Sequence, residues 1–391
     1  MAKLPADRTK LNAAVQNQQP SFIADAIANR EALIEAYDTI DMLYNFTAGL
    51  VAGGTLQPYP HGLYRNAIIN GNFDVCQRGG IFSNVPSGTY TADRWLYLYD
   101  GAGQQHTISR QAFTPGQTEV PNEPRYFLRV AVTNPASGQT HNAIHQRIES
   151  VRTFAGQKVT FSFWAKADAS RTLAVNFWQS FGSGGSSEVG VLGGIFNLTT
   201  FWQRYTCTVD IPSIAGKTIG SGDFLAVDFS FPIGETFTID IAQVQLNAGD
   251  VALPYQPRQY AEELALCMRY FEKSYDVDVT PGSSTGWGME TIFAVSSVES
   301  GGHLDLFRNG PLQFKVPKRT SSPTIQIFDR ITGQLNSIYN DSTGQSITFS
   351  SVDFLTPGQN QVNIRLVGLN GSNIINAGDM LSYHWTADAE L

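Results

Sequence analysis

Alternation of apolar and polar positions runs through residues 64–253. Runs such as KVTFSFWAKA, TLAVNFWQS and TFTIDIAQVQL place an apolar or aromatic residue at nearly every second position. This period is typical of β-strands, and turn-rich stretches such as FGSGGSSEVG separate the runs. Because no helical pattern interrupts them, residues 64–253 are predicted to form an antiparallel β-sandwich of the jelly-roll type.

Residues 277–391 repeat this pattern on a smaller scale. Their candidate strands include TIFAVSS, TIQIFD and QVNIRLVGL. The pattern predicts a smaller C-terminal β-sandwich, so the chain as a whole is expected to be mainly β.

One short helix is predicted between the two β-rich parts, in residues 254–276. Its apolar residues gather toward one broad face and its charged residues lie largely opposite. The first group is Tyr260, Leu264, Leu266, Cys267, Tyr270 and Phe271, and the second is Glu262, Glu263, Arg269 and Lys273. Pro257 precedes the helix as a start signal, and the strand pattern resumes at Val277. We expect a helix near residues 258–273 that links the two sandwiches.

The first 63 residues follow a different pattern. Residues 1–20 are polar and lack any period, which is typical of an arm that becomes ordered on a partner. Residues 21–50 contain a stripe spaced alternately by four and three residues, as in a coiled coil. Its positions are Phe22, Ala26, Asn29, Leu33, Ala36, Ile40 and Leu43. A Gly/Pro-rich linker, residues 51–63, follows at once.

Two interpretations of this stripe remain open. The helix could pack against its own chain, or it could associate with identical helices as an oligomerisation stalk. The linker separates it from the next domain, so identical helices are the nearest partners, and self-association is the favoured interpretation.

The composition supports the prediction of a mainly β protein and argues against some classes of function. Charged residues make up only 15% of the chain, while Gly (36), Phe (24) and Tyr (15) are abundant. The net charge is −8 and no Lys/Arg-rich run occurs, so binding to nucleic acid is not expected. No apolar run is suited to a signal peptide or a membrane span, which indicates synthesis in a cytoplasm without membrane insertion. Cys76, Cys207 and Cys267 are expected to be free thiols.

Four segments resemble phage and prophage tail-fibre-like proteins. NAIINGNFDVCQRG (66–79) with YTADRW (90–95) resembles the start of their jelly-roll domain, and residues 237–276 resemble its end and connecting helix. FKVPKRTSSPTI (314–325) and SYHWTADAEL (382–391) resemble the β-domain that often follows. The jelly roll is also similar to carbohydrate-binding modules. The resemblance covers roughly residues 66–391.

This resemblance implies a structural component of a tailed-phage virion. It implies a fibre-type external appendage, a homotrimer, that binds host surface glycan for adsorption. Residues 1–20 would anchor it to a tail, baseplate or capsid protein. The alternative is a head-attached fibre or spike that decorates the capsid, and tail and head attachment are left open.

No catalytic motif is found, and the chain is expected not to be an enzyme. A capsular polysaccharide-degrading enzyme is the less favoured alternative. Glycosidases use two carboxyl groups on opposite sides of the scissile bond, and a pair such as Glu188 and Asp228 could serve. His141 and His145 are four residues apart, but their segment has the pattern of a loop that leads into a strand, so no metal site is assigned to them.

Glycan binding needs aromatic faces for the C–H side of a sugar and polar groups at their rims. The candidates are Trp178, Gln179, Trp202 and Tyr97, with Trp178 favoured for the surface because the loop SFGSGGSSEVG follows it closely. Trp95 is expected in the core. No cofactor is expected other than a structural calcium ion, which the resemblance to carbohydrate-binding modules would place near Asn72 and Asp240.

Overall fold

The computed structural model describes residues 66–306, 310–370 and 375–391. The predicted arm, stripe helix and linker lie outside the described residues, so the stalk remains a prediction. Where the chain is described it is mainly β, and it contains one α-helix, α4 (Tyr260–Met268). No helix in these described ranges is long and apolar enough to cross a membrane.

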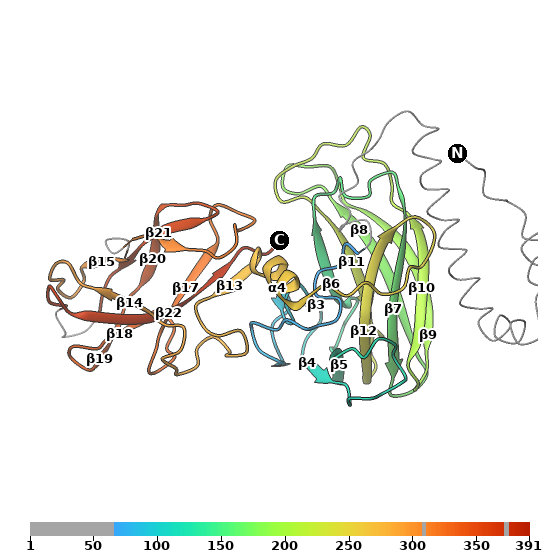
Figure 1. Ribbon diagram of the computed structural model, residues 1–391. Helices are drawn as coiled ribbons and strands as arrows, with labels where there is room; N and C mark the ends of the chain where they lie inside the picture. The colour runs from blue at the N-terminus through green and yellow to red at the C-terminus, as the bar shows by residue number, and fades with distance from the viewer. Residues whose placement is uncertain (1–65, 307–309, 371–374) are drawn as a thin grey trace, which may run out of the picture. The chain divides into compact units, whose positions relative to one another are not determined.

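Two six-stranded antiparallel sheets form the first half of the described chain (Figure 1). The β7 sheet has the order β1 (Ile81–Ser83), β4 (Gln105–Ala112), β5 (Tyr126–Asn134), β12 (Phe237–Ala248), β7 (Lys158–Ala167) and β10 (Gln203–Asp210). The β8 sheet has the order β2 (Thr89–Tyr90), β3 (Leu96–Tyr99), β6 (Asn142–Glu149), β11 (Phe224–Ser230), β8 (Arg171–Ser180) and β9 (Val189–Leu198).

The pairing of these strands is nested. β8 pairs with β9, β7 with β10, β6 with β11 and β5 with β12, and every pair is antiparallel. The chain thus forms one long hairpin whose strand pairs alternate between the two sheets. This is the topology of a jelly roll, and it confirms the fold predicted for this region.

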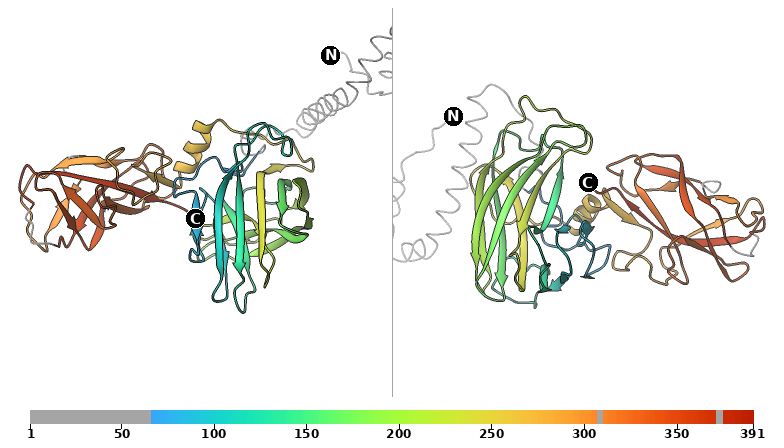
Figure 2. Two further views of the ribbon diagram at one scale, coloured as in Figure 1. Left: turned by 90° about the horizontal axis from the view of Figure 1, so that it is seen from below. Right: turned by 180° about the vertical axis from the view of Figure 1, so that it is seen from behind.

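Aromatic side chains fill the space between the two sheets, whose layers are visible from two further directions in Figure 2. Phe161 of β7 lies with its ring centroid 6.0 Å from that of Phe177 on β8 and 5.5 Å from that of Phe229 on β11. Trp95 belongs to the same core and is fully buried, as predicted. The strands therefore alternate between a core side and an outward side.

A second hydrophobic cluster lies in the C-terminal half, whose strands form one six-stranded and one four-stranded sheet. The larger contains β13 (Phe271–Lys273), β14 (Glu290–Phe293), β17 (Thr324–Asp329), β18 (Ser337–Asn340), β19 (Gln345–Thr348) and β22 (Met380–Asp388). The smaller contains β15 (His303–Asp305), β16 (Leu312–Gln313), β20 (Ser351–Thr356) and β21 (Gln361–Val367). This arrangement is sandwich-like, as expected.

The linking helix is present but shorter than predicted. Phe271–Lys273 pair with Thr386–Asp388 as strand β13, so the chain leaves the helix after Met268. Two charged residues assigned to the solvent side are in fact buried. Glu263 accepts a hydrogen bond from the Asn70 amide at 2.6 Å, and Lys273 Nζ donates to the Gln77 carbonyl at 2.7 Å. Both bonds fasten the helix region to the jelly roll.

The segments that carry the family resemblance meet around this helix. Gly71 lies against β12 so closely that a Cβ would stand 2.1 Å from the Val244 carbonyl oxygen. Farther on, Arg94 forms an ion pair with Glu390 and lies over the Tyr270 ring. These contacts join residues of the segments 66–79 and 237–276, and of the segments 90–95, 237–276 and 382–391.

Candidate functional site

The outward side of the β8 sheet carries a compact group of polar and aromatic residues. Val175 and Phe177 of β8 lie in the core, so Asn176 and Trp178 lie on the opposite side. In β11, Val227 and Phe229 are in the core, which places Asp228 on the outward side as well. This outward side is called the β8 face below.

Strand register aligns these residues in rows across the β8 face. In one row, Asp228 stands between His145 on β6 and Asn176 on β8, and Leu192 on β9 follows Asn176. In the neighbouring row, Ala226 stands between Arg147 and Trp178, and Gly190 follows Trp178. The row that contains Asp228, called the polar row below, thus lies beside the row that contains Trp178.

The indole of Trp178 spans three strands. A Cβ on Gly190 would lie 2.5 Å from Cζ3, 2.8 Å from Cε3 and 3.1 Å from Cη2 of Trp178, so the six-membered ring covers this glycine of β9. On the other side, Nε1 donates a hydrogen bond to Asp228 Oδ2 on β11. Contacts with strands on both sides require the ring to lie along the sheet. One flat face of the half-buried indole therefore points outward.

Asp228 organises the polar row. Its Oδ1 accepts hydrogen bonds from Asn176 Nδ2 at 3.1 Å and from Ser230 Oγ at 2.9 Å, in addition to the bond from Trp178 at Oδ2. Asn176 Nδ2 also donates to Ser230 Oγ at 3.0 Å. These bonds hold a buried carboxylate in place and fix the orientation of the groups around it.

Three ionisable groups surround this network. Burial, with Arg147 and His141 nearby, lowers the pKa of His145 to about 3, so its ring is neutral at ordinary pH. Burial also raises the pKa of the Glu188 carboxyl; Arg147 opposes this shift and Asp228 adds to it. These couplings place Glu188, Arg147 and Asp228 in one electrostatic neighbourhood. Leu192 and Ile195, which are 58% and 64% exposed, supply apolar surface beside it.

The outward side of the β7 sheet is different. Trp202 is only 7% exposed and packs there with Phe113 and Phe127, at centroid distances of 5.3 and 5.4 Å. Residues 113–125, which connect β4 to β5, contribute Phe113 and Val120 to this cluster. Because this connection covers the ring, Trp202 offers little surface to a ligand.

The other two predicted glycan contacts also lie away from the β8 face. Tyr97 is fully buried, donates to Asn142 Oδ1 at 2.8 Å, and has a pKa raised by burial. Gln179 is buried as well, and its amide donates to the Pro212 carbonyl at 2.9 Å. The structure therefore does not bring the four predicted residues together, and only Trp178 stands on the β8 face.

Asp240, one of the two residues proposed near a calcium ion, is paired with cations. Arg129 Nε and Nη2 donate to its two carboxylate oxygens at 2.7 and 2.8 Å, and Lys166 Nζ lies 4.0 Å away. Calcium prefers six to eight oxygen ligands without such competing positive charge. Within the described ranges no group of three or more His, Cys, Asp or Glu side chains is placed to hold a metal. Calcium near Asn72 stays a prediction.

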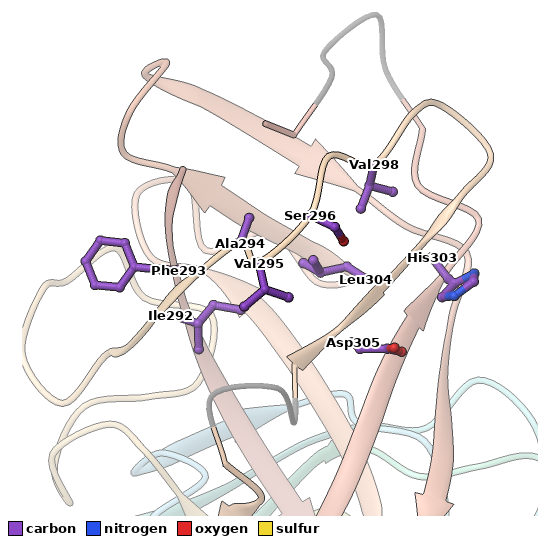
Figure 3. Close-up of a pocket in the computed structure, with 9 residues that line it drawn as sticks. All are labelled: Ile292, Phe293, Ala294, Val295, Ser296, Val298, His303, Leu304 and Asp305. Carbon is purple, nitrogen blue, oxygen red and sulfur yellow. The ribbon is translucent and has the colours of Figure 1, made fainter. Parts of the chain in front are cut away.

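Two pockets lie away from the β8 face. The pocket in Figure 3, in the C-terminal half, measures about 50 Å³, enough for a few waters but not for a sugar. Its Asp305 is paired with Arg365 at 2.5 Å, and Phe293 lies apart from the other lining side chains (Figure 3). A larger pocket of about 360 Å³ lies beside α4, but its Arg269 and Glu149 are paired with each other at 2.7 Å.

Sequence reasoning missed most of the β8 face. The sequence does not single out Asn176 or His145 as ligand contacts, and it suggests Asp228 only as half of a pair of acids. The alternation in TLAVNFWQS does place Asn176 and Trp178 on one side of a strand. The contributions of β6 and β11 depend on register, which no local pattern in the sequence reveals.

Comparison with known proteins identifies no family, since no family model and no curated protein matches the chain. Solved structures do show similarity. A structure described as "CBM4 structure and function" is 19% identical and covers 46% of this chain and 98% of its own, with a TM-score of 0.28. TmCBM61 in complex with β-1,4-galactotriose is 11% identical and covers 47% and 99%, with a TM-score of 0.29.

A domain of bacteriophage CBA120 tailspike protein 4, described as enzymatically active, is 16% identical to this chain. The match covers 43% of this chain and 21% of the tailspike chain, with a TM-score of 0.29. All three likenesses fall below 25% identity and below a TM-score of 0.5. The function is therefore inferred from the geometry of the β8 face.

Proposed function

We propose that this chain is a glycan-binding protein whose site is the β8 face. The observation that carries this proposal is the posture of Trp178, which lies along the sheet over Gly190 and is held there by Asp228. A pyranose ring can stack its C–H side on such an indole while its hydroxyl groups bond to polar side chains beside it. Asn176, which is half-buried, lies in the adjoining row and is oriented by the buried Asp228.

The biological setting we propose is a fibre-type appendage of a tailed-phage virion. The four sequence segments that resemble tail-fibre-like proteins support it, and residues 1–20 would attach the chain to the particle. Head attachment remains the alternative. Crosslinking from residues 1–20 in assembled particles distinguishes the two, because the captured partner is a tail or baseplate protein in one case and a capsid protein in the other.

We further propose a parallel homotrimer held by the stripe from Phe22 to Leu43. Linked sites that engage together exceed the affinity of a single site by about 100-fold or more. Light scattering should then give about three times the 42.8 kDa chain mass. Leu33→Asp with Ile40→Asp should yield monomers with folded sandwiches, and a wild-type monomer at micromolar concentration would contradict the stalk.

Affinity electrophoresis against a panel of surface polysaccharides tests the binding proposal. Trp178→Ala should weaken retention by about 30-fold, as expected for loss of a central aromatic contact worth about 2 kcal/mol. Trp287→Ala is the matched control, because Trp287 is 77% exposed but belongs to the C-terminal half. Equal retention of the wild type and Trp178→Ala would show that the β8 face is not the binding site.

One observation keeps a second candidate function open. The raised pKa of Glu188 near Asp228 is the kind of asymmetry that a glycosidase uses to separate a general acid from an ionised partner. Release of reducing ends from a retained polysaccharide, abolished in Glu188→Gln, would establish cleavage. Retention without any such release supports binding alone.

A further inference from the structure

The larger pocket, beside α4, has an apolar lining that is only partly covered. Its volume is about 360 Å³, against about 50 Å³ for the pocket in Figure 3. The apolar lining comes from Ala67, Ile69, Ile148, Leu266 and the ring of Tyr270. Ile69 and Leu266 are only half-buried, although both side chains are aliphatic. An apolar surface of this kind marks a place where another part of a protein binds.

Two arginines at this pocket are already paired with residues of this chain. Arg258 Nη1 donates to the Ile68 carbonyl at 2.9 Å and to Glu263 Oε1 at 3.1 Å. Arg269 Nε donates to Glu149 Oε1 at 2.7 Å. A small charged ligand would have to compete with these bonds, whereas a peptide segment with apolar side chains would leave them intact. A peptide segment is therefore the better occupant.

The described chain begins at the wall of this pocket. Asn66 lines the pocket, is only 3% exposed, and accepts at Oδ1 from the Ile68 and Leu246 amides at 3.0 and 3.3 Å. Arg258 Nη2 donates to the Asn66 carbonyl. Side chain and main chain of Asn66 are thus both held, so the residues before it must leave from this point. Because a chain spans at most about 3.6 Å per residue, residues 61–65 lie within roughly 18 Å of Asn66.

We propose that residues 61–65 (HGLYR) occupy this pocket and place the side chains of Leu63 and Tyr64 on its apolar lining. The Cα atoms of Tyr64 and Leu63 lie at most about 7 and 11 Å from that of Asn66, so both side chains can reach the pocket. Each then covers apolar surface that would otherwise face water. This packing is independent of the proposed glycan site.

The same segment matches the pocket in charge, and its packing shortens the predicted linker. Arg65 brings a positive charge to a lining that includes Glu262, an exposed carboxylate of α4. With residues 61–65 packed on the jelly roll, the Gly/Pro-rich linker ends near residue 60 instead of residue 63. The point at which the predicted stalk joins each jelly roll is then fixed beside α4.

Limited proteolysis of the full chain tests whether the segment is packed. Trypsin cleaves after Arg65 only when the residues around it open locally. The wild type should be cleaved there at least tenfold more slowly than Leu63→Ser with Tyr64→Ser, as followed by mass spectrometry. Tyr59→Ser is the matched control, because Tyr59 is an aromatic residue of the same linker outside the segment. Equal cleavage rates in the wild type and the double variant would overturn the proposal.

A double-mutant cycle tests whether this pocket is the place where the segment packs. Leu266→Ala should lower the melting temperature of the wild type by about 3 °C, but that of Tyr64→Ser by about 1 °C or less, because the partner is already lost. Leu264→Ala is the control, since Leu264 is also half-buried on α4 but does not line the pocket. Its effect should be the same in both backgrounds. Equal effects of Leu266→Ala in the two backgrounds would contradict packing at this pocket.

A monomeric variant identifies the copy of the chain that supplies the segment. In a homotrimer, residues 61–65 of a second copy could fill the pocket instead. In Leu33→Asp with Ile40→Asp, which is expected to be monomeric, the protection of Arg65 and the coupling to Leu266 should both persist. Loss of both in this variant would assign the segment to a second copy and overturn packing within one chain.

Discussion

Trp202 and Trp178 lie on the outward sides of the two jelly-roll sheets, but Trp202 is covered by other residues and Trp178 keeps one face of its ring open. The connection of residues 113–125 contributes Phe113 and Val120 to the cluster around Trp202, and Gln243 of β12 donates to the Pro121 carbonyl at 2.6 Å to hold that connection down. Trp178 instead lies over a glycine and beside a polar row. The first ring is part of a small core, and the second is a platform.

The difference lies in what each sheet offers the ring. On the β7 side the chain supplies other aromatic residues, so Trp202 gains stability by packing against them. On the β8 side Gly190 and Ala226 are small, and Asp228 takes the indole N–H, so the ring is positioned without being enclosed. Whether an aromatic ring is enclosed or leaves one face open thus depends on its neighbours and not on its residue type.

The largest expected effect is on stability. Trp202→Ala removes the centre of a packed aromatic cluster and should lower the free energy of unfolding by about 3–5 kcal/mol. Trp178→Ala removes a half-buried ring and one hydrogen bond to the buried Asp228 carboxylate, so it should cost less, about 1–2 kcal/mol. Urea unfolding of both variants measures this. Similar losses in the two variants would mean that the platform is also a core residue.

The next largest effect is the loss of folding stability at acidic pH. Because burial depresses the pKa of His145 from 6.5 to about 3, the folded protein binds fewer protons than the unfolded chain between these values. Stability is therefore present above pH 6.5 and is lost as the pH falls toward 3. Between pH 7 and pH 5 this group alone should remove about 2 kcal/mol.

His145→Gln isolates that contribution, since glutamine is polar but does not titrate. The variant should lose about 2 kcal/mol less than the wild type between pH 7 and pH 5 in urea unfolding. His303→Gln is the control, because His303 is exposed in the C-terminal half. Parallel pH curves for wild type and His145→Gln would show that His145 is not held neutral on the β8 face.

Local pattern was enough to predict the fold of the described chain. The alternation in β7 and β8 shows which residues enter a core, and the absence of helical segments between strands favours an antiparallel sandwich. The predicted linking helix is too long at its C-terminal end. Phe271, Glu272 and Lys273 mix apolar and charged side chains in a way that suits either a helix or a strand. Their pairing with β22, more than 100 residues away, decides in favour of a strand.

The site was less accessible to sequence reasoning. Trp178 could be chosen because a loop follows it, but Tyr97 and Trp202 are equally aromatic and are buried by residues distant in sequence. Gln179 follows Trp178 directly and therefore points to the other side of the strand. The network around Asp228 joins β8 to β11 across 50 residues, and only the register reveals it.

The smallest expected effect is on glycan binding, and it tests whether the orientation of the Trp178 ring matters in addition to the ring itself. Gly190→Ala leaves the indole in the protein but places a methyl group 2.5–3.1 Å from three of its ring atoms. Gly190 does not require a positive φ, so alanine fits the backbone and the strain falls on the ring. The indole must then tilt away from β9, and its bond to Asp228 must lengthen or break. Glycan binding should weaken by about tenfold, equivalent to about 1.4 kcal/mol.

The free energy of unfolding should fall by only about 1 kcal/mol in this variant, because the displaced ring can move into solvent but weakens one hydrogen bond to the buried Asp228 carboxylate. Gly80→Ala is the matched control, since a Cβ at Gly80 would meet no heavy atom within 4 Å and Gly80 also has no positive φ. Calorimetric titration with the retained polymer, combined with thermal unfolding, measures both quantities. If Gly190→Ala binds like the wild type while Trp178→Ala does not, the indole contributes area and not a fixed flat face. Trp178 and Trp202 would then differ only in how much of each ring is exposed.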